Sequence, residues 1–116
     1  MEKEYIKNYF RIICDMPLRV LVKNTRDWTK EIRNAKNAEY ENAFRELRAA
    51  CIVAYNLTMY CDLCNAIFKK TRRGYKIETL ETTKYFYTIR DIENYVNYNL
   101  DCIPLATISN WYAEHK

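Results

Sequence analysis

The sequence predicts a mainly α-helical protein: a small helical bundle around one long buried central helix, with one short β-hairpin. One glycine and two prolines in 116 residues are too few for a turn-rich all-β chain. The composition, 49% hydrophobic and 29% charged, is typical of a globular domain. No proline or glycine interrupts the long segment from residue 38 to 70. We therefore expect a single helical domain spanning residues 1–116.

Two helices are expected before the central one. Apolar residues three or four positions apart predict an amphipathic helix from Glu2 to Cys14. Pro17 ends this helix and suits the first turn of the next, where no amide proton is needed. A second apolar stripe predicts a helix through about Ala35, with a break near Asn24 as the alternative.

The central helix is expected over residues 38–70. No charged residue occurs from Ala49 to Cys61, so apolar side chains face nearly every direction there, as in a buried helix. The 20-residue stretch from Ala49 to Phe68 is also long enough to be tested as a membrane span. Asn56 and Asp62 lie inside it, and such polar groups are costly in hydrocarbon. We expect a buried bundle helix and no membrane association.

The pattern changes after Gly74. Apolar and polar residues alternate from Tyr75, which predicts a hairpin over residues 75–87 that turns near Glu81 and Thr82. The alternative is a loop that leads into the next helix. Thr88 with Asp91 has the spacing of a capping box and predicts a helix start. A final short helix is expected after Pro104.

The inventory of reactive residues argues against an enzyme. The one serine, Ser109, and the one histidine, His115, are six positions apart on the same predicted helix. Six residues turn a helix by about 240°, so the two side chains would face different directions. A phosphate-cradling loop needs several glycines, and the chain has one. We expect no catalysis and no cofactor.

Cys61 and Cys64 have the two-residue gap of zinc ribbons, but a structural zinc site needs four ligands. They also lie late in the predicted helix, where the helix dipole does not favour a thiolate. We expect packing thiols and no metal. Five cysteines behind an N-terminus without an apolar signal core favour a cytoplasmic location.

A basic cluster follows the apolar part of the predicted central helix. Cations complement the dipole at a helix C-terminus, and Gly74 would supply a left-handed C-cap. Four basic residues in five positions exceed what capping requires, and the adjoining tyrosine and lysine suit contact with phosphates or an acidic protein. The predicted partner-binding residues are Lys69, Lys70, Arg72, Arg73, Tyr75 and Lys76.

Two alternatives remain open. The C-terminal pair of predicted helices has the outline of a helix-turn-helix, with residues 104–116 as recognition helix, although that helix is poor in the basic residues that read bases. The eleven tyrosines, among them Tyr95, Tyr98 and Tyr112, also suit a self-association surface in a homodimer or larger oligomer.

The leading hypothesis is a non-catalytic binding protein that modulates or inhibits a macromolecular partner. That partner would be a protein or a protein–nucleic acid complex. The abundance of Asn, Tyr, Ile and Lys, with one serine and no glutamine, is typical of small proteins from AT-rich bacteria and their phages. An anti-defence protein of a phage or mobile element, such as an inhibitor of a CRISPR nuclease, is the concrete form. The alternatives are a small nucleic-acid-binding regulator and a homo-oligomeric structural protein.

Overall fold

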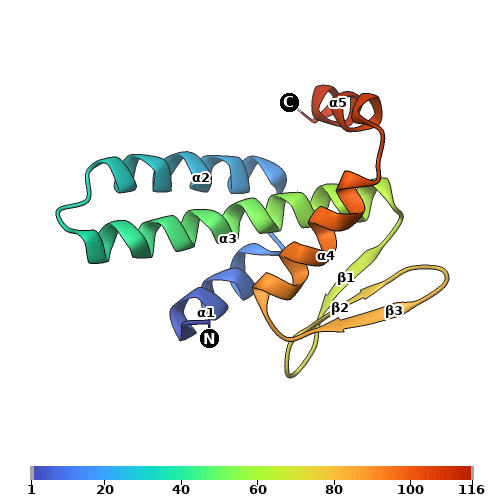
Figure 1. Ribbon diagram of the computed structural model, residues 1–116, viewed down its shortest axis with the longest axis horizontal. Helices are drawn as coiled ribbons and strands as arrows, with labels where there is room; N and C mark the ends of the chain where they lie inside the picture. Colours follow the sequence, from blue (N-terminus) through green and yellow to red (C-terminus); the bar gives the residue numbers. More distant parts are fainter. Residues whose placement is uncertain (1, 116) are drawn as a thin grey trace.

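The computed structural model describes residues 2–115 and has a mainly helical fold, as predicted, with a small antiparallel sheet. Figure 1 shows the arrangement of these elements. In chain order they are α1 (Glu4–Ile13), α2 (Leu18–Arg33), α3 (Ala38–Leu63), β1 (Ile67–Lys70), β2 (Tyr75–Glu78), β3 (Thr83–Phe86), α4 (Ile89–Asp101) and α5 (Leu105–Glu114).

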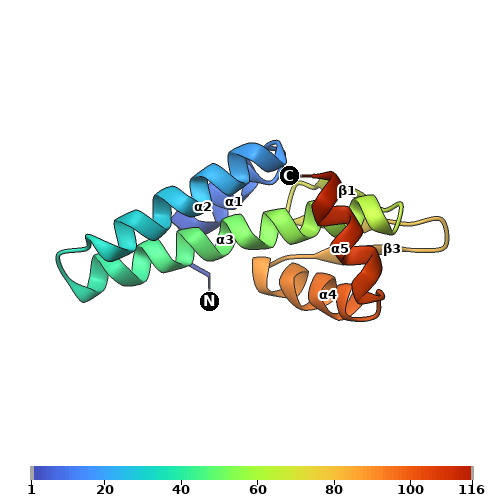
Figure 2. The same ribbon diagram turned by 90° about the horizontal axis from the view of Figure 1, so that it is seen from above.

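The long helix α3 is the centre of the molecule. Helix α2 runs beside its N-terminal half, and α1 and α4 also pack against it (Figures 1 and 2). Side chains from all of these elements join one buried cluster, of which Phe10, Leu21 and Ile92 are fully enclosed. Among residues 2–115, no helix is both long enough and apolar enough to cross a bilayer.

The prediction that the central helix continues to residue 70 was wrong. Helix α3 ends at Leu63, and Asn65 takes a left-handed φ of 51°. The amide of Ala66 then donates to the Cys61 carbonyl at 3.0 Å, which closes a Schellman motif. Asparagine is the residue after glycine that best tolerates this conformation, so the helix ends without a glycine or a proline.

The predicted hairpin is confirmed as β2 and β3, and β1 is an additional strand. The order is β1-β2-β3, and both pairs are antiparallel. Tyr75 and Ile77 point into the core, while Lys76 and Glu78 remain at the surface. At the β2–β3 turn, the Thr79 amide donates to the Thr82 carbonyl at 2.8 Å.

The remaining helix predictions agree with the structure, and only the alternative of a break near Asn24 is wrong. Helix α2 is continuous through Asn24, and the Thr25 hydroxyl donates to the Leu21 carbonyl at 2.8 Å. The predicted cap at the start of α4 forms, because the Thr88 hydroxyl accepts a hydrogen bond from the Asp91 amide. Helix α5 begins directly after Pro104, as predicted.

Candidate partner-binding surface

The predicted basic cluster lies on the first hairpin of the sheet and not at a helix end. Lys69 and Lys70 belong to β1, Arg72 and Arg73 lie in the turn, and Lys76 belongs to β2. Because α3 ends before any of them, the interpretation of these cations as caps of its C-terminus is wrong. Their positions must instead be explained by the hairpin.

Carboxylates hold all three lysines of the hairpin. The Glu78 carboxylate lies 3.3 Å from the Lys69 ammonium and 3.1 Å from that of Lys76. Hydrogen bonds from Lys76 and Lys69 lower the pKa of Glu78 below its usual value. Lys70 pairs with Asp15 and also donates to the Arg11 carbonyl at 3.1 Å. These pairs are partly or wholly exposed, so a partner could replace them at little energetic cost.

Tyr75 was predicted to contact the partner, and the structure corrects this. Its side chain is only 4% exposed, because it packs edge-on against Phe10 and stacks on Phe68. The Arg11 guanidinium covers the ring at 5.4 Å from its centroid. Tyr75 therefore supports the hairpin from below and is not part of its surface.

Arg11 fixes the β1–β2 turn to α1. Its two terminal nitrogens donate to the carbonyls of Thr71 and Gly74, each at 3.2 Å. Within the turn, the Thr71 amide donates to the Gly74 carbonyl at 2.8 Å, and the Gly74 amide donates to the Thr71 hydroxyl at 3.0 Å. The turn is thus held by its own hydrogen bonds and by a cation from a neighbouring helix.

Gly74 is required by close backbone approach. Its φ is not in the left-handed region, contrary to the expectation of a left-handed cap. A Cβ at this position would lie 2.2 Å from the Phe86 carbonyl oxygen, well inside the contact distance of two atoms. Only glycine lets β3 pass this close to the turn.

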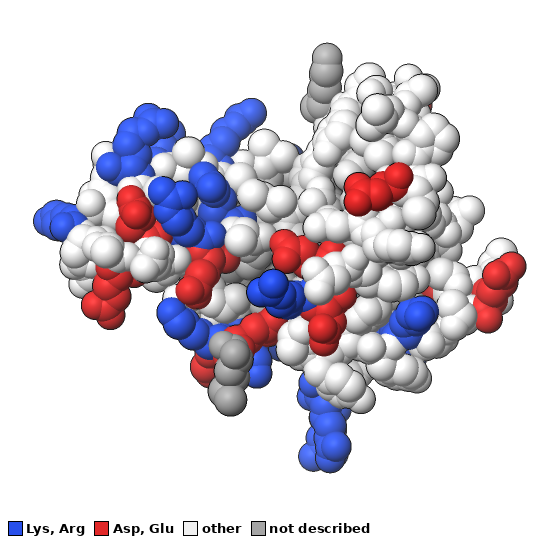
Figure 3. Space-filling view, in the orientation of Figure 1, with Lys and Arg blue, Asp and Glu red and all other residues white. Residues whose placement is uncertain are grey.

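Arg72 and Arg73 are the two cations of the hairpin that remain available. Both are exposed, and neither forms an ion pair within residues 2–115. Figure 3 shows a basic projection at the lower edge of the molecule, where Figure 1 places the β1–β2 turn. The turn therefore presents two guanidinium groups on an ordered support.

A second basic surface was missed by the sequence analysis. We call it the α2 basic face, and it consists of Arg19, Lys23, Arg26, Lys30 and Arg33. All five side chains are exposed, and they gather over α2 in the upper left of Figure 3. The signal was present in the sequence, because successive members are four, three, four and three positions apart. That spacing places side chains on one side of a helix.

The C-terminal helices do not favour the helix-turn-helix alternative. No lysine or arginine occurs from Asp91 to His115, so α5 offers no cation for a phosphate or a base. Its buried Trp111 donates from the indole nitrogen to the Asp62 carboxylate of α3. Leu105 is 82% exposed on the outside of α5, which suits protein contact better than nucleic-acid contact.

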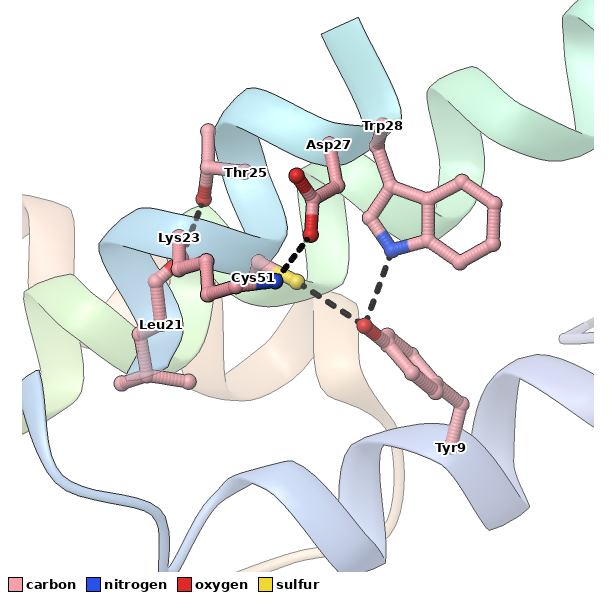
Figure 4. Close-up of polar contacts among 7 residues, drawn as sticks. All are labelled: Tyr9, Leu21, Lys23, Thr25, Asp27, Trp28 and Cys51. Atoms are coloured by element: carbon pink, nitrogen blue, oxygen red, sulfur yellow. Dashed lines mark hydrogen bonds and ion pairs between the residues drawn. The ribbon is translucent and has the colours of Figure 1, made fainter. Parts of the chain in front are cut away.

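The prediction of packing thiols is wrong for Cys64, which is exposed, whereas Cys61 is half-buried. Cys51 is buried 3.2 Å from the Tyr9 hydroxyl, which also accepts a hydrogen bond from the Trp28 indole (Figure 4). These contacts join α1, α2 and α3, and desolvation raises the pKa of Tyr9 to about 12. Burial likewise raises the pKa of Cys61 to about 11. Among residues 2–115, no three potential ligands are grouped closely enough to hold a metal ion.

A shallow cavity of about 320 Å³ lies between α1, α3 and the start of α4. Its anion-binding groups are already occupied, because the Glu2 carboxylate accepts hydrogen bonds from the amides of Ile89 and Arg90. The rim has mixed charge, with Glu46 and Glu93 opposite Lys3 and Arg90. We therefore place the candidate site at the hairpin. No protein-family model, curated protein or solved structure matches this chain, so its function is inferred from its own residues.

Proposed function

We propose that this chain is a non-catalytic binding protein that modulates or inhibits a macromolecular partner through the β1–β2 turn. Arg72 and Arg73 make the leading contacts, and Lys69, Lys70 and Lys76 lie behind them. In its concrete form the protein acts in the cytoplasm as an anti-defence factor of a phage or mobile element, for example against a CRISPR nuclease. The composition and small size of the chain support this form.

The observation that carries the proposal is the ordered support of two unpaired guanidinium groups. Arg11 and the hydrogen bonds of the turn hold the backbone on both sides of Arg72 and Arg73. A preorganised loop loses less conformational freedom on binding than a mobile one. Guanidinium groups also bind carboxylates and phosphates through two parallel hydrogen bonds.

Charge defines the kind of partner. A groove that binds nucleic acid is itself basic and would repel this turn. The turn therefore fits an acidic groove on a protein, or exposed phosphates in a protein–nucleic acid complex. In either case the inhibitor acts by blocking the groove and neutralising its charge, without a chemical step.

The test is a comparison of tagged variants in a lysate of the native host, after digestion of nucleic acids. The double variant Arg72→Glu/Arg73→Glu reverses the charge of the turn. Arg26→Glu/Arg33→Glu is the matched control, because it makes the same change in net charge on α2. We expect the wild-type chain and the control to retain a partner that the turn variant loses. Equal capture by all three chains would contradict the proposal.

A homo-oligomer is the second candidate, and exposed residues of the C-terminal helices favour it. Tyr98 is 72% exposed and Leu105 is 82% exposed, and both lie in the stretch from residue 91 to 115, which has no lysine or arginine. Light scattering on the purified chain tests this candidate. A stable oligomer that Leu105→Glu dissociates and Arg72→Glu leaves intact would favour the oligomer over the inhibitor.

A further inference from the structure

The α2 basic face is a second surface with its own geometry. Its members span fifteen residues, from Arg19 to Arg33, and the fourteen steps between them measure about 21 Å along the helix. At about 100° per residue, all five lie within an arc of roughly 80°. The buried residues of the helix, Leu21 and Ile32, lie on the opposite side. The result is a straight row of cations directed into solvent.

Few carboxylates neutralise this row. Within residues 2–115, its one ion pair joins Lys23 to Asp27 at 2.8 Å (Figure 4). On the side facing α3, Arg48 reaches Thr29 of α2 at 3.4 Å and extends the positive surface. The two carboxylates of α2 itself, Asp27 and Glu31, lie on one side of the row at about 100° per residue.

The row also works against the stability of its own helix. Like charges three or four positions apart repel each other on a helix surface. Successive members of the α2 basic face form four such pairs, and Asp27 relieves the repulsion at Lys23, with which it pairs, and also attracts Lys30. A solvated helix face has no structural need for this arrangement, since alternating charges would be more stable. Repulsion of this kind is expected where an anionic ligand completes the surface.

We propose that the α2 basic face binds the phosphate backbone of double-stranded nucleic acid, independently of sequence. A row of cations is sufficient for phosphate contact, which dominates non-specific affinity. An interface with an acidic protein would have an apolar or aromatic centre depleted of lysine. The buried apolar residues of α2, Leu21 and Ile32, lie on the other side of the helix from the α2 basic face. Stacking platforms for single strands likewise need exposed aromatic rings. The aromatic residue of α2, Trp28, instead packs against Phe44 and Tyr9.

Fluorescence anisotropy with a labelled 20-base-pair duplex of random sequence, between 50 and 200 mM KCl, tests the proposal. For four or five phosphate contacts, the logarithm of the binding constant should fall with that of salt with a slope of about −4. Arg26→Gln/Arg33→Gln should reduce the steepness of that slope by about two. Lys84→Gln/Arg90→Gln is the control with the same net charge, because both residues are exposed and lie outside the two basic surfaces, and we expect its slope to match the wild type within about one unit.

Three results would overturn the proposal. One is an absence of duplex binding at 50 mM KCl, and another is an equal loss in both double variants, which would show a net-charge effect. The third is competition by polyglutamate as strong as that by duplex at equal charge, which would assign the face to an acidic protein. Circular dichroism confirms that each variant is folded. Since the pull-down uses digested lysate, failure of either proposal leaves the other intact.

Discussion

The β1–β2 hairpin and the α2 basic face each carry five lysine or arginine residues, but they arrange them in opposite ways. On the hairpin, Glu78 and Asp15 engage all three lysines, and two arginines remain free at the turn. On α2, Lys23 is paired with Asp27, and the other four cations of the row form no ion pair within residues 2–115. The hairpin thus presents a small fixed tip, whereas the helix presents an extended line of charge.

The difference shows that cations adjacent in the sequence need not form a positive patch on the surface, and that cations dispersed in the sequence can form one. Successive residues of a strand point to opposite faces. Lys69 therefore pairs with Glu78 across the sheet, while its neighbour Lys70 reaches Asp15 at the end of α1. On a helix, residues three or four positions apart share one face, so a dispersed set of cations becomes a continuous row. Folding therefore separates the clustered cations of the hairpin and brings the dispersed cations of the α2 basic face together.

We expect the largest loss of stability from a substitution that disrupts the hairpin and does not alter α2. Gly74→Ala would put a methyl group 2.2 Å from the Phe86 carbonyl oxygen, so the β1–β2 turn and β3 must separate. We expect a loss of about 3 kcal/mol in the free energy of unfolding, as for severe overpacking. Urea unfolding followed by circular dichroism measures it.

Arg73→Ala, one position away and exposed, is the matched control for this experiment. It should change the free energy of unfolding by less than about 0.5 kcal/mol. If Gly74→Ala were equally mild, the backbone of β3 would not pass as close to the turn as the structure places it.

The sequence predicted the second hairpin but not the first, for a physical reason. Alternation from Tyr75 to Glu78 identifies a strand with one buried face. Ile67 to Lys70 shows two apolar residues followed by two lysines, a pattern that also suits the last turns of an amphipathic helix. Pairing with β2 decides between them, and that contact is tertiary. The stop at Asn65 is a weak local signal, because asparagine is less specific than glycine.

The sequence predicted the basic cluster at residues 69–76 but not what each of its members contacts. The prediction placed the contact near residues 69–76, but it could not foresee that Tyr75 would fill space beside Phe10. Nor could it pair Lys70 with Asp15, since the two are far apart in the chain. The α2 basic face needed no tertiary information. The apolar stripe of the same helix defined its outer side, and the basic residues could have been read against it.

We expect a moderate effect from a substitution that leaves the hairpin lysines without a carboxylate partner, as most cations of α2 are. Glu78→Gln removes the carboxylate shared by Lys69 and Lys76 and so releases two cations. The lysines lower the pKa of Glu78 from 4.5, so its stabilising contribution is complete above pH about 5 and is lost as pH falls through the lowered pKa. The wild type should be more stable than the variant at pH 7, and the difference should disappear toward pH 3.

Thermal unfolding between pH 7 and 3 measures this convergence. Glu81→Gln is the control, because it makes the same charge change in the neighbouring loop, where Glu81 is exposed. A constant stability difference at all pH values would mean that the two lysines do not hold Glu78 in solution.

The smallest expected effect is a gain in stability, and it comes from a substitution on α2. Arg26 has Lys23 three positions before it and Lys30 four positions after it, so Arg26→Ala removes two repulsive pairs and introduces a strong helix former. We expect the free energy of unfolding to rise by about 0.5 kcal/mol in dilute buffer. The part that comes from repulsion should vanish in 1 M salt, where the screening length is about 3 Å.

Lys23→Ala distinguishes repulsion from helix propensity, because it makes the same gain in propensity but also removes the pair with Asp27. It should give a smaller rise than Arg26→Ala, or none. A loss of more than about 1 kcal/mol on Arg26→Ala would mean that the side chain supports the fold, in which case the row could not be explained by a ligand. A gain means that the helix tolerates repulsion that its own packing does not require, and an anionic partner along α2 would remove that repulsion.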